Sequence, residues 1–343
     1  MKAVYLVKKG KASKAFEIRE TDIPTLLDHE VLIKVEGFGL NFADVLARLG
    51  LYPDAPKMPS ILGYDVVGRI ESLGKDVEGL EIGDRVTAMT RFGGYAEYAK
   101  TDHRGVAKIP EDLDACIGTA LPVQGGTAYY MAEEMVNIFP GDRVLVHAAA
   151  GGVGSLLCQM CKKKGAYVYG TAGSGEKLKY LESIGVDHPI GYRDSDFFKA
   201  IQQNERDSGS PGLDVVFDPI GGSSFKKGMK LLSSGGRMVI FGVSALTNAK
   251  NILQKLKVAS GLGIHSPISF LSSSKSVIGV NMLRIADNKP DVLKRVLQGT
   301  VKMADNEIIK PMKGGVFFVD ELAQAHEALE KRKTMGKLMI KWS

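Results

Sequence analysis

The clearest candidate for chemistry in this sequence is a glycine-rich turn between an apolar run and an apparent helix. The residues from 148 to 154 read AAAGGVG and follow the apolar run 144–146. In the pattern G-x-G-x-x-G the three glycine positions fall on Ala149, Gly151 and Gly154, so alanine replaces the first glycine. Gly151 lets a ligand approach the backbone, and Gly154 lets the helix pack closely on the sheet. This spacing predicts a dinucleotide site.

The helix that follows the turn would supply the groups that hold a diphosphate. Backbone N–H groups are exposed at the amino end of a helix, which is also positively polarised. The predicted cofactor contacts in the turn are Ala150, Gly151, Gly152, Val153 and Gly154.

The end of the next strand indicates which nicotinamide cofactor is used. An NAD site usually places an acidic side chain there to bind the ribose 2′-hydroxyl. Here the nearest acid, Glu176, lies past the strand and beside Lys177. Ser174 can donate to a 2′-phosphate, Lys177 supplies a compensating charge, and Tyr192 with Arg193 could close over the same group. We therefore expect NADPH. The alternatives are a solvated Lys177 and a Tyr192 that is an ordinary surface aromatic.

Three further features lie near the expected ends of the strands. Ligands bind at the carboxyl ends of open parallel sheets, so Phe241 and Gly242 are candidate cofactor contacts. The segment 218–222, DPIGG, is placed similarly, although turn chemistry also accounts for its glycines and proline. His147 lies just before the glycine turn, and we expect it to be a packed structural residue.

The elements that must position these residues follow from the hydrophobic pattern. From about residue 128 the sequence alternates between strand and helix patterns, which predicts a parallel, doubly wound sheet. The expected strands are 143–147, 166–171, 213–218 and 237–242. The expected helices are 152–164, one from 176, and one around 225–232.

The flanking sequence has a different texture. The first ~120 residues carry short β-rich runs separated by Gly and Pro, which is typical of a largely antiparallel β domain. Beyond about residue 275 we expect mixed elements, including helices at 290–297 and 320–333 and a strand at 338–340. The predicted organisation is a Rossmann domain, 123–269, inserted in a catalytic domain formed by 1–122 plus 270–343, with the active site between them.

Composition excludes several classes of protein. The 343 residues are 44% hydrophobic and 24% charged, as expected of a folded globular chain, and the net charge of +6 is spread without a basic tail for nucleic acid. We see no apolar run long enough for a membrane span and no signal-peptide pattern at the start, so a cytoplasmic location is expected. Cys158 and Cys161 form a C-x-x-C that we interpret as two small core residues.

Several motifs, in order along the chain, resemble the medium-chain dehydrogenase/reductase family, specifically its quinone oxidoreductase and zeta-crystallin group. They are GLNFAD at 39–44, GLYP at 50–53, GYDVVG at 63–68, GDRV at 83–86, GGYAEY at 93–98 and the glycine turn. The narrower likeness is to VAT-1-like proteins. It depends on NFAD at 41–44, HPI at 188–190, DPIGG at 218–222 and the long segment 248–280.

The resemblance implies a GroES-like catalytic domain without a metal. Zinc-dependent relatives have a cysteine in place of Asn41, a His-Glu pair in place of Tyr64 and Asp65, and another cysteine around 122–123. None of these replacements offers the thiolate and imidazole ligands of a catalytic zinc site. The four-cysteine zinc lobe expected soon after Arg91 is also absent from the sequence.

The resemblance further implies hydride transfer from NADPH to a quinone or another electron-poor unsaturated carbonyl. Asn41 could then bind the nicotinamide ribose or the substrate oxygen, and Tyr52 could donate a hydrogen bond or a proton, its alternative being a packed turn aromatic. Tyr64 is expected to line the site, Thr127 to contact the cofactor, and Asp44 to act at a helix start.

Two alternatives stay open at this point. One is a 2-alkenal, enone or enoyl-thioester reductase. The other is a non-catalytic, NADPH-binding and membrane-associated protein, for which segment 252–271 is the membrane candidate, although we favour a lid over the substrate there. The group also implies a homodimer joined through edge strands, which we place at 237–241 and its neighbours.

Overall fold

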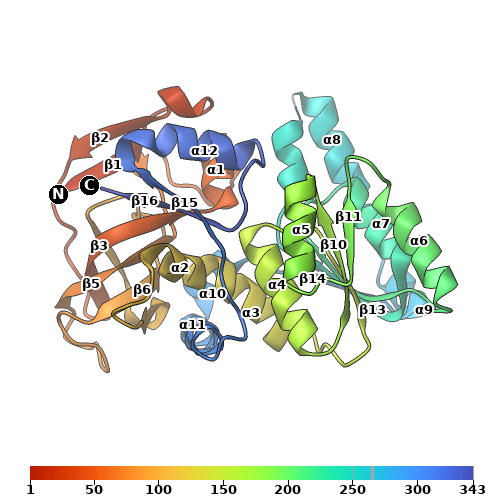
Figure 1. Cartoon of the computed structure of the whole chain (residues 1–343). Helices are drawn as coiled ribbons and strands as arrows, with labels where there is room; N and C mark the ends of the chain where they lie inside the picture. The colour runs from red at the N-terminus through yellow and green to blue at the C-terminus, as the bar shows by residue number, and fades with distance from the viewer. Residues whose placement is uncertain (250, 264–265, 343) are drawn as a thin grey trace. The chain divides into compact units, whose positions relative to one another are not determined.

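The computed structural model describes residues 1–249, 251–263 and 266–342, which form two compact units (Figure 1). Unit 1 comprises residues 1–127, 282–307 and the chain from Pro311 onwards. Unit 2 comprises Ala128–Asn281 and Ile308–Lys310.

Unit 2 is built on a parallel sheet in the order β11-β10-β9-β12-β13-β14. Its strands are β9 (Arg143–Val146), β10 (Tyr167–Ala172), β11 (His188–Gly191), β12 (Leu213–Asp218), β13 (Leu232–Ile240) and β14 (Ser276–Gly279). Numbered from β9, this is the strand order of a dinucleotide-binding fold, and the order reverses between β9 and β12. The predicted doubly wound sheet is confirmed.

Helices cover both faces of this sheet, which is why its central strands are almost entirely apolar. In Figure 1, α4 (Gly152–Lys163) and α5 (Gly175–Ser183) lie on one face, and α6 (Phe197–Asp207) and α7 (Ser223–Leu231) on the other. The remaining helices of unit 2 are η4 (Tyr130–Met135), η5 (Ser244–Asn248), α8 (Ile252–Gly261) and α9 (Pro267–Ser273). Cys158 and Cys161 are buried in α4, as expected.

One expectation about the sheet is correct only in part. We placed the edge at 237–241 and its neighbours, but residues 237–240 belong to β13, which lies between β12 and β14. The edge strand is β14, which pairs with β13 in parallel register from Arg237↔Ser276 to Ile240↔Gly279. Its short sequence, SVIG, follows two helices and carries too little strand pattern to be recognised.

Because of strand β14, unit 2 ends later in the sequence than we expected for the Rossmann domain. Unit 2 extends to Asn281 instead of 269, because β14 completes the parallel sheet. At the first junction unit 1 extends to Thr127 instead of 122. There a Cβ on Gly125 would meet Thr300 of the helix α11 (Pro290–Asp305) at 2.5 Å, so residues 121–127 pack within unit 1.

Unit 1 contains a sheet in the order β15-β16-β3-β5-β6-β8, with β7 also paired to β3. All pairs are antiparallel except β15 with β16. A smaller sheet has the order β2-β1-β4. The strands are β1 (Lys2–Leu6), β2 (Phe16–Glu20), β3 (Glu30–Leu40), β4 (Ser60–Ile61), β5 (Asp65–Leu73), β6 (Arg85–Met89), β7 (Tyr98–Asp102), β8 (Val106–Lys108), β15 (Lys313–Phe318) and β16 (Lys337–Lys341).

Short helices connect and cover these strands. They are η1 (Ala12–Lys14), α1 (Phe42–Arg48), η2 (His103–Gly105), α2 (Ala115–Ala120), η3 (Leu121–Gly125), α3 (Gly126–Tyr129), α10 (Met282–Asn288), α11, η6 (Val319–Glu321) and α12 (Leu322–Glu330). The predicted helices at 290–297 and 320–333 correspond to α11, which is longer, and α12, which is shorter.

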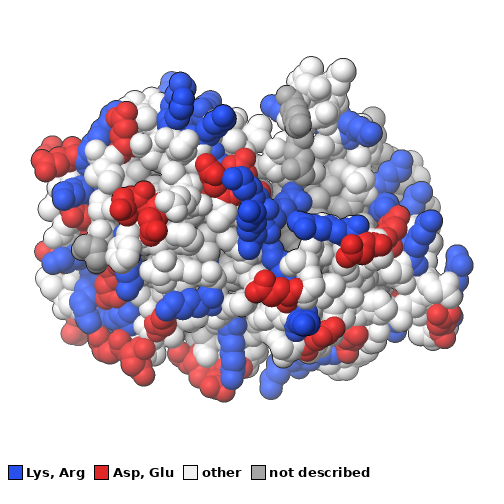
Figure 2. Space-filling model, turned by 45° about the horizontal axis from the view of Figure 1, so that its top comes forward, with Lys and Arg blue, Asp and Glu red and all other residues white. Residues whose placement is uncertain are grey.

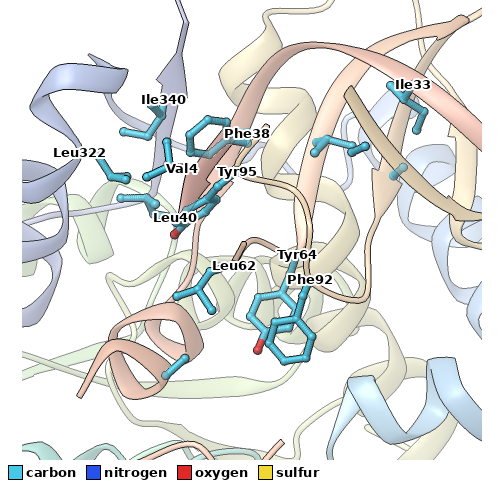
Figure 3. Close-up of a cluster of buried hydrophobic side chains, with 14 of the residues drawn as sticks. Val4, Ile33, Phe38, Leu40, Leu62, Tyr64, Phe92, Tyr95, Leu322 and Ile340 are labelled. Carbon is cyan, nitrogen blue, oxygen red and sulfur yellow. The ribbon is translucent and has the colours of Figure 1, made fainter. Parts of the chain in front are cut away.

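An aromatic and aliphatic core holds unit 1 together (Figure 3). Phe38 of β3 stacks on Tyr95 with ring centroids 4.6 Å apart, and Leu322 and Ile340 lie on the same side of the cluster. Tyr64 and Phe92 form a second contact, 5.0 Å between centroids. Aromatic pairs at these separations add to the burial energy and fix the strands that carry them.

Two properties of the described residues bear on the predicted partners. No helix in the described part of the chain is long and apolar enough to cross a membrane. Figure 2 shows basic and acidic side chains interspersed over the visible face, as the spread of charge in the sequence indicated.

Candidate active-site residues in the two units

The glycine turn of unit 2 lies where the sequence places it, between β9 and α4. Gly151 is the N-cap of α4, and its N–H donates to the Ala148 carbonyl at 2.9 Å. Ala149 donates to the Thr171 carbonyl at 2.9 Å, which ties the turn to the end of β10. By helix geometry the N–H groups of Gly152, Val153 and Gly154 have no acceptor in their own helix. They are free to face a diphosphate.

Close packing explains why glycine ends the motif. A Cβ on Gly154 would lie 2.4 Å from the Ala148 carbonyl oxygen and 2.8 Å from the Ala149 Cα. These are backbone atoms, so a side chain at 154 would push α4 away from the turn. Ala149 and Ala150 are buried beneath it, and the replacement of the first glycine by alanine is accommodated. The turn has the cradle that a dinucleotide requires.

The residues predicted to select NADPH follow the adjacent strands β10 and β11. Ser174 is the N-cap of α5, and Lys177 lies in its first turn. Tyr192 follows β11, and its N–H donates to the Ala172 carbonyl at 3.1 Å. A Cβ on Gly173 would come within 2.4 Å of the Tyr192 hydroxyl oxygen, so this hydroxyl lies against the turn that carries Ser174. Arg193 and Lys227 line a surface hollow beside Tyr192.

The segment after β12 has a structural role that accounts for its sequence. Asp218 Oδ1 accepts from the N–H groups of Ile220 at 2.7 Å and Gly221 at 3.1 Å, and Oδ2 accepts from Ser224 Oγ at 2.7 Å. The carboxylate therefore organises its own turn. After β13, the Phe241 N–H donates to the Asp218 carbonyl at 3.3 Å, which holds that loop at the same end of the sheet.

His147 is a packed residue, in agreement with its interpretation from the sequence. Its Nδ1 lies 3.0 Å from Thr171 Oγ1, and its ring packs edge-on against Phe197 with centroids 4.7 Å apart. Burial lowers the pKa of the imidazole, which keeps it neutral.

In unit 1, three side chains far apart in sequence meet in a buried polar network. Asn41 follows β3, Asp65 begins β5 and Lys337 begins β16. Sheet register brings them together, because Asp65 and Met339 both pair with Gly39 of β3. Lys337 Nζ donates to Asp65 Oδ2 and to Asn41 Oδ1, the latter at 3.2 Å. Asn41 Nδ2 donates to Asp65 Oδ2.

The network has a further tie to the backbone. Asp65 Oδ1 accepts from the Val123 N–H at 2.9 Å. Asp65 and Lys337 are both fully buried, so neither charge is shared with solvent. Sequence analysis named Asn41 but missed Lys337. The available signal was a lysine directly before the apolar run LMI at 338–340, because a buried lysine needs a partner.

Asp44 acts at the start of α1, as its position indicated. Its Oδ2 accepts from the Asn41 N–H at 2.8 Å. The carboxyl group is completely buried, and burial, opposed by the hydrogen bond from Asn41, raises its pKa to about 7.

Tyr52 and Tyr64 lie together in unit 1. Their rings meet edge to face with centroids 6.3 Å apart. The Tyr64 hydroxyl is buried, and its polar neighbour is the Tyr52 phenol. Burial raises the pKa of both phenols, so both keep their proton and can donate it in a hydrogen bond. Thr127, in α3, is also buried.

Asn41, Tyr64 and Asp65 are the positions at which the family resemblance led us to look for zinc ligands. Asn41 and Asp65 are bonded to the Lys337 ammonium, and Tyr64 offers a protonated phenol. Within the part of the chain that the structure describes, no cluster of three His, Cys, Asp or Glu side chains is placed to hold a metal ion. An ammonium at this place would repel a divalent cation.

Comparison with known proteins places this chain among dehydrogenases and reductases. The model of the alcohol dehydrogenase GroES-like domain matches residues 27–111, and the model called zinc-binding dehydrogenase matches 152–298. A synaptic vesicle membrane protein VAT-1 homolog of Danio rerio is 31% identical over 338 residues, which are 97% of this chain and 66% of that protein.

Two further relatives are quinone oxidoreductases. The human protein is 31% identical over 320 residues, 93% of this chain and 91% of the relative. The crystal structure of Escherichia coli quinone oxidoreductase complexed with NADPH is 25% identical, with a TM-score of 0.85 over 99% of this chain and 100% of that one. A GroES-like domain joined to a dinucleotide-binding domain defines an oxidoreductase class. This chain belongs to the medium-chain dehydrogenase/reductase family, in the group of quinone oxidoreductases and VAT-1 homologues.

Proposed function

We propose that this protein is an NADPH-dependent quinone oxidoreductase that works without a metal. It would reduce quinones or other electron-poor unsaturated carbonyls. The observation that carries the proposal is at the end of β10, where the Tyr192 hydroxyl lies against the turn that carries Ser174 and Lys177 lies in the first turn of the helix that follows. The relative complexed with NADPH supports the same cofactor.

The residues of unit 2 would bind two charged groups of the cofactor, its diphosphate and its 2′-phosphate. The first-turn N–H groups of α4, at Gly152, Val153 and Gly154, would bind the diphosphate beside Ala150 and Gly151. Ser174, Lys177 and Tyr192 would bind the 2′-phosphate. For the rest of the cofactor, the predicted contacts are Phe241, Gly242 and Thr127. When bound, the reduced nicotinamide supplies the hydride.

The residues of unit 1 would act on the oxygen of the substrate. Asn41 would offer its carboxamide to that oxygen or to the nicotinamide ribose. The neighbouring phenols of Tyr52 and Tyr64 would donate hydrogen bonds to the developing oxyanion. A quinone needs little more, because its product anion is delocalised and solvent can protonate it. The Lys337 ammonium supports the metal-free part of the proposal, since it already neutralises Asp65.

Absorbance of the reduced nicotinamide tests this function directly. We expect oxidation of NADPH, and much slower oxidation of NADH, with ortho- and para-quinones. The matched variant is Lys177→Ala, which should raise the KM for NADPH by roughly tenfold and leave that for NADH unchanged. Equal use of both cofactors by the wild type, or turnover that requires added zinc, would contradict the proposal.

The substrate panel separates the main alternative. A 2-alkenal, enone or enoyl-thioester reductase uses the same fold and cofactor, so only its substrate profile differs. Enones and enoyl thioesters are therefore measured beside the quinones at equal concentration. Faster turnover of either class than of every quinone would favour the alternative.

A second candidate function is favoured by the exposed apolar side chains of α8 and α9. Ile252, Leu253 and Leu256 of α8 and Ile268 and Leu271 of α9 are each more than half exposed. In Figure 2 the tip formed by α8 is largely uncharged, with basic residues at its margin. Such a surface suits a non-catalytic, membrane-associated NADPH-binding protein. Sedimentation with anionic vesicles, together with NADPH binding but no turnover, would support this over the proposed cytoplasmic enzyme.

We also propose that two copies associate through β14. This strand is an edge of the unit 2 sheet and is partly exposed. An open edge can pair with a second copy across a twofold axis. Sedimentation equilibrium should give twice the mass of the 37.0 kDa chain, and a monomer at micromolar concentration would contradict this proposal.

A further inference from the structure

Lys337 is a fully buried lysine whose ammonium is held by two side chains from other elements. It donates to Asp65 at the start of β5 and to Asn41 Oδ1 at the end of β3. Asp65 also accepts from Asn41 Nδ2, so the three groups form a closed triangle. Each member touches both others.

The triangle fixes the orientation of one amide. An ammonium can only donate hydrogen bonds, and an ionised carboxylate can only accept them. Asn41 must therefore present its oxygen to Lys337 and its nitrogen to Asp65. An asparagine in a neutral environment can exchange the two atoms by a flip of the amide plane. Here the flip would place oxygen against carboxylate and nitrogen against ammonium.

A neighbouring glycine leaves space for the Lys337 side chain, although an apolar residue would stabilise strand β16 equally well. The next residues of β16, Leu338, Met339 and Ile340, are buried and apolar, and a buried charge pair seldom stabilises more than apolar residues of similar volume. Yet a Cβ on Gly39 would lie 2.2 Å from Lys337 Cε and 2.6 Å from Nζ. Gly39 leaves the space that the end of the lysine occupies.

We propose that Lys337 is the positioning residue for Asn41. It locks the carboxamide, directly and through Asp65, in the single orientation that serves the nicotinamide end of the cofactor and the substrate oxygen. This inference rests on the proposed function, because that function assigns Asn41 its role. Lys337 would contact neither the cofactor nor the substrate and would act through Asn41.

The test compares a whole cofactor with a fragment. NADPH engages all the proposed contacts, whereas adenosine 2′,5′-bisphosphate presents only the groups expected at Ser174, Lys177 and Tyr192. Binding of both is measured by calorimetry for the wild type, Lys337→Met, Asn41→Ala and the double variant. We expect Lys337→Met to weaken NADPH about tenfold, the effect of a misplaced hydrogen bond, and to leave the bisphosphate unchanged. In the Asn41→Ala background it should have no further effect.

A second variant keeps the test valid if Lys337→Met does not fold. Asp65→Asn with Lys337→Met removes both charges and leaves an acceptor for the Val123 N–H. This double variant no longer fixes the orientation of the Asn41 amide, so we expect the same selective loss of NADPH affinity. Circular dichroism and thermal melting establish that each variant is folded.

Three outcomes would overturn the inference. Lys337→Met could leave NADPH affinity unchanged, weaken the bisphosphate equally, or weaken NADPH as much in the Asn41→Ala background as in the wild type. If one of these outcomes occurs and the wild type binds and oxidises NADPH normally, the inference about Lys337 fails and the proposed function stands. If the wild type binds the bisphosphate but not NADPH, both the inference and the proposed function fail.

Discussion

The Tyr192 hydroxyl lies against Gly173, so close that a Cβ on residue 173 would come within 2.4 Å of its oxygen. The two residues come from different segments, one after β11 and the other after β10. Their contact sets where the ring lies over the turn that carries Ser174. Any side chain at 173 must displace the ring.

Gly173→Ala should therefore weaken NADPH selectively. The clash is with the end of a side chain, so the ring moves and the fold survives. We expect the Kd for NADPH to rise by about three- to tenfold, or roughly 1 kcal/mol, with no change for NADH. Fluorescence titration measures both. The control is Gly279→Ala, where a Cβ meets nothing within 4 Å. Equal losses for the two cofactors would show that Tyr192 does not contact the 2′-phosphate.

Gly154→Ala should act differently, because its clash is with backbone. A Cβ there would lie 2.4 Å from the Ala148 carbonyl oxygen, and neither atom can move without shifting α4 or the turn. We expect a loss of about 1–3 kcal/mol in the free energy of unfolding, together with loss of NADPH binding. Gly175→Ala, where a Cβ has open space, is the control for stability in urea. An unchanged unfolding midpoint for Gly154→Ala would contradict the packing described here.

Asp44 should make stability depend on pH. Burial raises its pKa to about 7, so the folded state holds a proton that the unfolded state releases above about pH 4. The stability that this group contributes to the wild type is full below about pH 4, falls as the pH rises from 4 to 7 and is constant above that. Asp44→Asn does not ionise, so its stability relative to wild type should rise over that window, by up to about 4 kcal/mol.

Thermal unfolding of both proteins between pH 4 and 8 checks this. Asp84→Asn serves as the opposite control. Partial burial raises the pKa of Asp84, but the hydrogen bond from Lys108 outweighs burial, and the net shift is downward. Its ionised form is favoured by folding, so the stability difference between Asp84→Asn and wild type should change only below about pH 4 and stay constant between pH 4 and 8, where Asp84 is ionised in both states. A pH-independent difference for Asp44→Asn would refute the assignment.

Tyr64→Phe should separate stability from activity. The buried hydroxyl has the Tyr52 phenol as its polar neighbour, so its removal should change the stability of the free protein by less than about 1 kcal/mol. If the hydroxyl donates to the substrate oxyanion, kcat with quinones should fall by about tenfold or more. Differential scanning calorimetry and steady-state kinetics measure the two effects. A variant that is both less stable and fully active would assign Tyr64 to packing alone.

Local patterns in the sequence predicted much of the fold. The glycine turn, the βα alternation and the antiparallel first domain could be predicted because hydrophobic period and turn chemistry act over a few residues. Strand β14 could not, since four residues between helices carry too little pattern, and the edge of the sheet was therefore misplaced.

The candidate site was predictable to a different degree in the two units. Ser174, Lys177 and Tyr192 follow consecutive strands of a parallel sheet, whose ends must meet at one edge. The triangle of Asn41, Asp65 and Lys337 depends on the register of three antiparallel strands, and a single sequence does not specify how distant strands align. Lys337, almost 300 positions from Asn41, was missed for that reason.

The three cysteines have a bearing on the chemistry of the proposed substrates. Cys116, Cys158 and Cys161 are all buried, and burial raises the pKa of each thiol, that of Cys161 to about 12. Quinones and enones are electrophiles that alkylate thiolates, and a thiol that is hidden and protonated reacts slowly. An enzyme that handles such compounds would thus be protected from alkylation by its own substrates.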